Sequence, residues 1–318
     1  MTAMIFTDIP VSEIDLSDTG FRITGSGCDI EHLSASICRY GIMVAPLVMC
    51  QRDKYIVVSG FRRIEAALHS GLSRISCRVM PAGQFLDAAL AAVTENSFSR
   101  ELTPAELIRA TTLLMGFMDA KSMAENATSI FNMPLNPGYI HTLARIHTMP
   151  DPVLDLLEQG QISIKACKNL LTLDSDILSE FLHLFSQIKV SSGIQMEIIA
   201  WAKEICALEK ISLSRLIQES PLDGNDAGHR DMGALGKQFK SFLAQRRFPA
   251  LTAAKFKAQE QIKTLDLDSG CQLTLPENFE GMVYTMQMEF KNEDEFNMRL
   301  NRLAKLSEHP AFKSLMAR

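Results

Sequence analysis

The chain has 318 residues, 47% of them hydrophobic and 22% charged, which is typical of a globular protein and excludes disordered, collagen-like and purely coiled-coil chains. Its 32 Lys and Arg against 37 Asp and Glu give a net charge of −5, which argues against coating nucleic acid through bulk charge. No apolar run approaches the roughly 20 residues of a membrane helix, and residues 1–10 do not resemble a signal peptide. We expect a cytoplasmic protein with no membrane partner and two or three domains.

The seven cysteines are odd in number, widely spaced and free of any C-x-x-C pair. A disulfide framework or a zinc site would need closer, paired spacing. The seven histidines form no H-E-x-x-H pattern either. We therefore expect reduced thiols, most of them in the core.

Short β-type runs alternate with helical runs over the first part of the chain. Gly41 and Gly71 each follow a helical run, where a left-handed cap belongs. This pattern predicts a small mixed α/β domain over residues 1–100. The expected strands are 5–10, 46–50, 55–58 and 75–80, and the expected helices are 29–40 and 62–70.

From residue 84 to about 217 the apolar pattern is almost wholly helical, which predicts a helical domain over residues 101–219. A helix should begin at Pro104, because Thr103 supplies a capping hydroxyl and Glu106 completes a capping box. A run of turn formers at 220–228 then predicts a linker over 220–235.

The last part of the chain, residues 236–318, forms a separate module in our interpretation. Residues 230–263 carry eight Lys and Arg against Asp231 and Glu260, a net charge of +6. These cations either form a solvated face outside an aromatic stripe or contact phosphates without sequence preference. Two expected strands, 271–275 and 282–290, precede an expected helix over 293–307, whose apolar face would complete a core or a dimer interface. That face consists of Phe296, Leu300, Leu303 and Leu306.

The turn after the expected strand 55–58 is a candidate phosphate site. Ser59 and Gly60 end the strand, and Arg62 and Arg63 lie in the first turn of the next helix. Unpaired backbone N–H groups and guanidinium groups at a helix start favour an anion. The alternative is that both arginines are ordinary surface charges.

Glu95 and Asn96 lie shortly before the helix that begins at Pro104. Adjacent carboxylate and amide oxygens suit Mg²⁺, which takes one or two protein oxygens and completes its shell with phosphate and water. The alternative is a polar helix end.

Together these segments resemble the ParB family of chromosome- and plasmid-partitioning proteins. The resemblance rests on a strand followed by G-x-R-R at 60–63, on E-N-x-x-x-x-x-L-x-P-x-E at 95–106, and on Met149-Pro150 before the helical segment that ends near residue 171. It implies an α+β fold: a ParB/sulfiredoxin-like domain, a helix-turn-helix domain, and a basic helix with a ββα module.

The resemblance also implies the ligands of the first domain. CTP would bind at the G-x-R-R turn, and Mg²⁺ would bind Glu95 and Asn96. The implied nucleotide contacts are Arg22, Ser59, Gly60, Phe61, Arg62, Arg63, Glu95 and Asn96.

The chain departs from the family pattern at several places. Phe61 stands where the family usually has Glu, and Glu65 stands where it has Arg or Lys. The family's next arginine falls on Ser99, with Arg100 one place later. These departures leave open the preference for cytosine and a weak CTPase activity, and they point to no catalytic residue.

The expected DNA-reading element is a helix over 122–131, a turn over 132–136 and a second helix over 137–147. The second helix would lie in the major groove, with Tyr139, His141, Thr142 and Arg145 as the polar candidates for base contacts. The alternative is a helical hairpin that only packs.

The resemblance implies a dimeric clamp on double-stranded DNA, regulated by CTP and Mg²⁺, that acts in plasmid or chromosome partitioning. Its implied partners are a second copy of the chain and a ParA-type ATPase, and its place is the nucleoid or a plasmid. The alternatives are a transcriptional regulator of a mobile element and an enzyme of the same fold, either a kinase or a nuclease.

Overall fold

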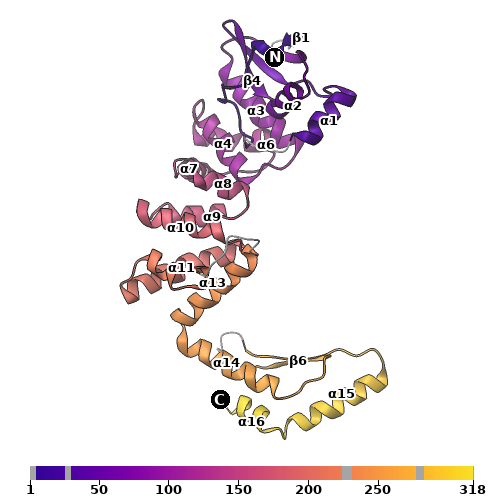
Figure 1. Ribbon diagram of the computed structural model, residues 1–318, viewed down its shortest axis with the longest axis vertical. Helices are drawn as coiled ribbons and strands as arrows, with labels where there is room; N and C mark the ends of the chain where they lie inside the picture. The colour runs from indigo at the N-terminus through magenta and orange to yellow at the C-terminus, as the bar shows by residue number, and fades with distance from the viewer. Residues whose placement is uncertain (1–4, 26–29, 224–230, 277–282, 318) are drawn as a thin grey trace. The chain divides into compact units, whose positions relative to one another are not determined.

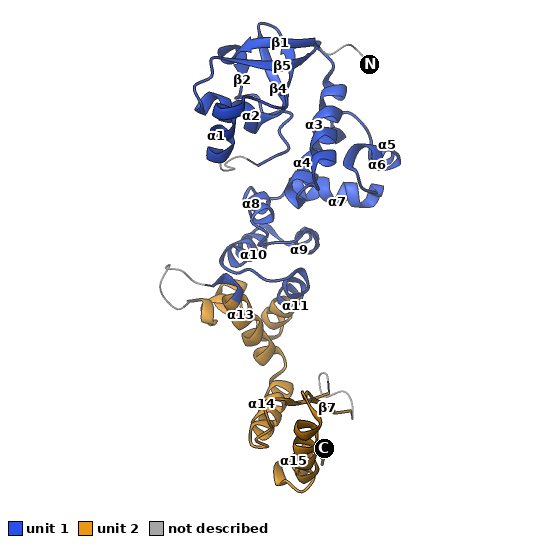
Figure 2. Cartoon of the chain, turned by 90° about the vertical axis from the view of Figure 1, so that its right-hand side faces the viewer, with its two compact units in different colours: residues 1–199, 230–233 blue, residues 200–229, 234–318 orange. Residues whose placement is uncertain are grey.

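The computed structural model describes residues 5–25, 30–223, 231–276 and 283–317. The chain forms two compact units, shown in different colours in Figure 2. The first contains residues 1–199 and 230–233, and the second contains residues 200–229 and 234–318. The domain boundaries expected from the sequence stay predictions. Of the expected linker, residues 224–230 lie outside the described residues, and residues from Met232 onward belong to a helix.

The first unit opens with a five-stranded mixed sheet, at the indigo end of the chain in Figure 1. Its strand order is β1-β5-β3-β4-β2. The pairs β1–β5 and β3–β4 are antiparallel, whereas β3–β5 and β2–β4 are parallel. The strands are β1 (Ile5–Pro10), β2 (Ile14–Asp15), β3 (Leu47–Gln51), β4 (Lys54–Ser59) and β5 (Arg74–Met80).

Two helices pack on this sheet, α1 (Glu31–Tyr40) and α2 (Phe61–His69). Ile37 and Ile64 join Val57 and Cys77 of the sheet in one buried cluster. Burial of such side chains is the main source of stability, at about 25 cal/mol per Å² of apolar surface. Gly41 ends α1 with the expected positive φ of +72°, but its ψ of −174° lies outside the left-handed helical region that the sequence predicted.

The rest of the first unit and the start of the second are helical, which confirms the α+β fold with a small N-terminal sheet domain. The predicted capping box is present, because Glu106 N–H donates to Thr103 Oγ1 at 3.3 Å and Thr103 N–H donates to Glu106 Oε2 at 2.9 Å. The helices are α3 (Phe85–Ser99), α4 (Pro104–Met115), α5 (Ala120–Glu125), α6 (Ala127–Phe131), α7 (Pro137–His147), α8 (Pro152–Glu158), α9 (Ile164–Leu170), α10 (Ser175–Gln187), α11 (Ser192–Glu209), α12 (Leu213–Gln218) and α13 (Met232–Arg247).

The prediction of a single helix over 122–131 is wrong. The segment consists of α5 and α6, which meet at Asn126, a residue outside helical geometry with φ of −104° and ψ of 8°. Helix α5 also begins earlier than expected, because Asp119 accepts hydrogen bonds from the N–H groups of Lys121 and Ser122. Helix α7 has the expected bounds, with Asn136 as its cap.

The C-terminal part of the second unit contains α14 (Pro249–Lys263), β6 (Cys271–Thr274), β7 (Thr285–Met288), α15 (Glu293–Leu306) and α16 (Pro310–Met316). Strands β6 and β7 form an antiparallel pair, shorter than the expected strands, and Met282 lies outside the described residues. The expected apolar face of α15 is only partly buried within this chain, and its role in a dimer interface stays a prediction. Leu300 is 47% exposed, whereas its neighbour Arg299 is buried against Asp268 and Glu295. Helix α16 was not expected from the sequence.

The predictions for the cysteines and for the basic stretch also need correction. None of the described cysteines is in a disulfide, but only Cys77 and Cys167 among them are buried, so most are not core thiols. The basic stretch does bury Phe239 and Leu243, yet its arginines are not all solvated cations. Arg246 pairs with Glu209 and Glu219, and Arg247 pairs with Glu204.

None of the helices in the described ranges is long and apolar enough to span a bilayer.

Candidate functional site

The turn between β4 and α2 opens into a cavity of about 320 Å³ in the first unit. Helix α3 forms another wall of this pocket, which we call the phosphate-turn pocket. Every nucleotide contact expected from the sequence lines it, apart from Arg22. The lining residues are Phe21, Ile23, Thr24, Leu33, Val58, Ser59, Gly60, Phe61, Arg62, Arg63, Glu95, Asn96, Ser99 and Arg100.

Gly60 gives the turn its shape. It caps α2 in the left-handed region, with φ of +94°, where a side chain would be strained. The guanidinium group of Arg63 lies against it, because a Cβ at position 60 would stand 3.1 Å from the Nε, Cζ and Nη2 atoms of Arg63. Glycine is therefore needed both for the backbone and for the approach of this arginine.

Arg63 is held on two sides. Its Nη2 donates to Glu95 Oε1 at 2.7 Å, and its Nη1 donates to the Val44 carbonyl at 2.7 Å. Arg78, on β5, donates through Nη2 to the other oxygen of Glu95, Oε2, at 3.1 Å. The carboxylate of Glu95 therefore joins three elements: α2, α3 and the sheet.

Arg22 does not line the pocket in the described part of the chain. It forms an ion pair with Glu65 at 2.7 Å, and its guanidinium group stacks 5.2 Å from the ring centroid of Phe61. Phe61 itself is 4% exposed, while Arg62, its neighbour in the first turn of α2, is exposed. Of the expected arginines, Arg62 is thus the most open to a ligand.

The end of α3 supplies polar groups that the sequence did not assign. Ser99 donates its hydroxyl to the Glu95 carbonyl, and Arg100 donates to Glu106 Oε2 at 2.7 Å. Burial raises the pKa of Glu106, but hydrogen bonds from Arg100 and from the Thr103 N–H outweigh it, so the net pKa is lowered. The family pattern placed an arginine one position earlier, which is the signal that could have indicated Arg100.

The expected magnesium ligands fit an ion poorly in this arrangement. Both carboxylate oxygens of Glu95 accept from guanidinium groups, and the amide nitrogen of Asn96 donates to the Ala92 carbonyl at 2.8 Å. Within the described ranges, no three or more His, Cys, Asp or Glu side chains form a cluster that could hold a metal. Asn96 lines the pocket, but Glu95 would have to leave two cations before it could bind a third.

Residues 2–97, a range that includes the pocket-lining residues from Phe21 to Asn96, match the ParB N-terminal domain family. The chain therefore contains a ParB N-terminal domain. Over 148 residues, 45% of its length, the chain is 27% identical to the probable chromosome 1-partitioning protein ParB of Deinococcus radiodurans. The matching region spans about half of that relative, 48%.

Three solved ParB structures are also similar. Two are of the C-terminally truncated chromosome-partitioning protein ParB from Caulobacter crescentus. The one complexed with CTP-γ-S is 21% identical, covers 57% of this chain and 98% of its own, and has a TM-score of 0.28. The one complexed to the centromeric parS site is 19% identical, with 56% and 91% covered and a TM-score of 0.34. The third, a Pnob8-like ParB-N domain, is 15% identical, with 81% and 98% covered and a TM-score of 0.38.

Beyond the ParB N-terminal domain, helix α7 presents one polar face. His141 and Arg145 are exposed one turn apart, whereas Ile140 and Leu143 are buried. Tyr139 and Thr142 are half-buried, and the Thr142 hydroxyl donates to the Gly138 carbonyl at 2.9 Å. Burial raises the pKa of Tyr139. His141 and Arg145 are therefore the two candidates whose side chains are most open to a partner.

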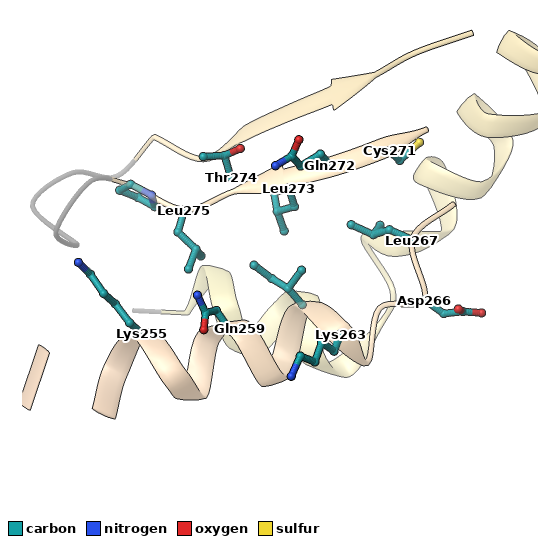
Figure 3. A pocket seen from close by; sticks show the side chains of 12 residues that line it. Lys255, Gln259, Lys263, Asp266, Leu267, Cys271, Gln272, Leu273, Thr274 and Leu275 are labelled. Carbon is teal, nitrogen blue, oxygen red and sulfur yellow. The ribbon is translucent and has the colours of Figure 1, made fainter. Parts of the chain in front are cut away.

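A second cavity, of about 860 Å³, lies in the C-terminal part between α14 and β6. Figure 3 shows Leu273 and Leu275 of the strand side turned toward α14, with Lys255 and Lys263 on the helix. The leucines belong to the small core of this module. Its lining among the described residues extends to Pro276, the last residue of the range 231–276.

Proposed function

We propose that this chain is a ParB-type DNA-binding partitioning protein whose state is regulated by CTP in the phosphate-turn pocket. The observation that carries the proposal is the turn itself: a left-handed Gly60 opens α2, and Arg62 and Arg63 lie in its first turn beside a cavity of about 320 Å³. The relative from Deinococcus radiodurans is named a probable chromosome-partitioning protein, and partitioning is the role we propose.

The chemistry of the proposed nucleotide step is recognition of a polyphosphate. Backbone N–H groups at the start of α2 carry the positive end of the helix dipole, which favours an anion there. Arg62 is exposed beside them and offers several N–H donors to phosphate oxygens. Apolar side chains such as Leu33 and Phe21 line the pocket and suit the flat face of a base.

The proposed DNA step uses α7. Its N-terminus and its exposed face, with His141 and Arg145, would enter the major groove. Helices α4 and α5 pack against α7. Nucleotide binding would favour a dimer that closes around DNA, as a shift between two states of the protein. We further propose that its partner is a ParA-type ATPase. We also propose that it is located in the cytoplasm, on the nucleoid or on a plasmid.

The finer prediction of Mg²⁺ on Glu95 and Asn96 stays a prediction. The ion would neutralise phosphate charge if it bound, but we assign no step to it, because Glu95 is paired with Arg63 and Arg78. Weak CTP hydrolysis likewise stays a prediction without an assigned residue.

Calorimetry on the full chain tests the nucleotide step, with CTP, ATP and GTP compared for wild type, Arg62→Ala and Arg39→Ala. Arg39 is an exposed arginine of the same domain outside the pocket, so it is the matched control. We expect binding that prefers CTP, a loss of about tenfold in Arg62→Ala, the scale of one charge-assisted contact, and no change in the control. Equal affinity for all three nucleotides would refute CTP regulation.

Selection from random DNA duplexes tests the DNA step. Wild type and Arg39→Ala should enrich the same site, and Arg145→Ala should lose about 1–3 kcal/mol of discrimination at the base that it reads. Enrichment of the same site with the same affinity by Arg145→Ala would refute the role of α7.

A further inference from the structure

The feature that carries our inference is the position of Glu95 between two guanidinium groups. Its Oε1 accepts from Arg63 at 2.7 Å and its Oε2 accepts from Arg78 at 3.1 Å. The side chain of Glu95 is 24% exposed, and those of Arg63 and Arg78 are 22% and 28% exposed. Ion pairs that are only partly solvated are screened less than pairs on an open surface.

The charges around Glu95 do not balance. One carboxylate serves two guanidinium groups, so Arg63, Glu95 and Arg78 together carry a net charge of +1. This positive charge lies at the pocket. Such a site attracts an anion, while a divalent cation at Glu95 would meet two positive neighbours within hydrogen-bond distance of its ligand.

The guanidinium group of Arg63 lies against Gly60 in the turn. Its donors are divided between Glu95 and the carbonyl of Val44. A phosphate that reaches this arginine must therefore compete with the carboxylate that already holds it.

We propose that Glu95 is the internal counter-ion of the phosphate turn, and that a polyphosphate binds by displacing it from Arg63 without a metal ion on Glu95. Arg78 is then a positioning residue, because it keeps its ion pair with Glu95 when the carboxylate leaves Arg63. This remaining ion pair lowers the free-energy cost of separating Glu95 from Arg63. This inference rests on the proposed nucleotide pocket and deepens it by assigning the metal requirement and the role of Glu95 and Arg78.

The test is binding of inorganic tripolyphosphate to the full chain, by calorimetry, in EDTA and in Mg²⁺ buffer. Wild type should bind in EDTA. Glu95→Gln should bind about tenfold tighter in EDTA, since a competing charge in contact with Arg63 is removed. A metal ligand at position 95 predicts the opposite, namely binding in Mg²⁺ only and its loss in Glu95→Gln, and that result would overturn the inference.

Arg78→Ala provides a second variant in case Glu95→Gln unfolds. We expect several-fold weaker tripolyphosphate binding in EDTA, because Glu95 loses its other partner and holds Arg63 more firmly. If Glu95 instead served a metal, removal of Arg78 would free the carboxylate and strengthen binding in Mg²⁺. Arg39→Ala should match wild type in both buffers.

The same experiment with CTP separates this inference from the proposed function. Tripolyphosphate binding as expected with no preference for CTP would refute CTP regulation and support the counter-ion role. CTP-selective binding that needs Mg²⁺ and disappears in Glu95→Gln would support the proposed function and overturn the counter-ion role.

Discussion

Replacing Gly60 by alanine tests whether the phosphate turn depends on its backbone conformation alone or also on the approach of Arg63. Gly71 is a matched control, since both glycines flank α2 and both have positive φ, +94° at Gly60 and +76° at Gly71. A Cβ at Gly71 would meet nothing within 4 Å, whereas at Gly60 it would stand 3.1 Å from three atoms of the Arg63 side chain. The two variants therefore share the backbone strain and differ in one contact.

The magnitudes follow from these contacts. A side chain in the left-handed region costs about 1–2 kcal/mol, so Gly71→Ala should destabilise α2 by that amount. At Gly60 the guanidinium group must also move by a few tenths of an ångström, which strains its bonds to Glu95 and Val44. Weakening a partly exposed ion pair adds about 0.5–1 kcal/mol, so Gly60→Ala should cost about 2–3 kcal/mol.

Hydrogen exchange of the full chain, followed by mass spectrometry, measures these costs locally in peptides that cover β4 and α2. Both variants should exchange faster than wild type there, with Gly60→Ala the faster. Gly60→Ala should also weaken polyphosphate binding, and Gly71→Ala should not. An equal loss of protection in the two variants, or weaker binding in both, would refute the link between Gly60 and Arg63.

Three further predictions concern other parts of the chain. Glu106→Gln should destabilise α4 by about 2 kcal/mol at neutral pH, because Arg100 and the Thr103 N–H lose a charged acceptor. Since the pKa of Glu106 is lowered in the folded protein, this advantage of wild type should fall as the pH drops below about 4. Burial raises the pKa of Cys77 to about 11, so iodoacetamide at pH 8 should modify the exposed Cys38 far sooner, as peptide mass spectrometry would measure. Leu143→Ala should destabilise α7 by about 2–5 kcal/mol, as the local loss of hydrogen-exchange protection would measure.

Each of these has a contradicting result. A pH-independent difference between wild type and Glu106→Gln would mean that the carboxylate is not held by its charge. Equal alkylation rates at the two cysteines would mean that the sheet opens readily in solution. His141→Ala is the control for Leu143→Ala and should change stability by less than about 0.5 kcal/mol, because its side chain is exposed. Similar losses in the two variants would contradict the packing of α7.

Elements with local signals could be predicted from the sequence. The helix that begins at Pro104 carries its own cap, and α7 begins at a proline directly after its cap Asn136, so both starts were predicted correctly. The break at Asn126 could not be predicted, because two short helices and one longer helix have the same apolar pattern. The two-residue strand β2 and helix α16 were also missed, since short segments owe their form to packing.

The sequence predicted which residues gather at the candidate site, but it did not predict which of them form ion pairs with each other. The G-x-R-R turn and the Glu95-Asn96 pair indicated which residues would gather, and the structure brings them to one pocket. The contacts of Arg63 with Glu95, and of Glu95 with Arg78, join residues 32 and 17 positions apart. Such pairs are decided by the fold, and no local pattern indicates which carboxylate an arginine will meet.

The contact of Arg22 with Phe61 and Glu65 has a consequence for how this chain could diverge. In the family pattern an acid stands at position 61 and a base at position 65, whereas here an aromatic ring lies under Arg22 and the acid lies one helical turn further along. Phe61 and Glu65 each make a favourable contact with Arg22. The variant Phe61→Glu alone would bury a charge, and Glu65→Arg alone would place a second cation beside Arg22. The two positions should therefore change together, and the double variant should lose less stability than the two single variants combined.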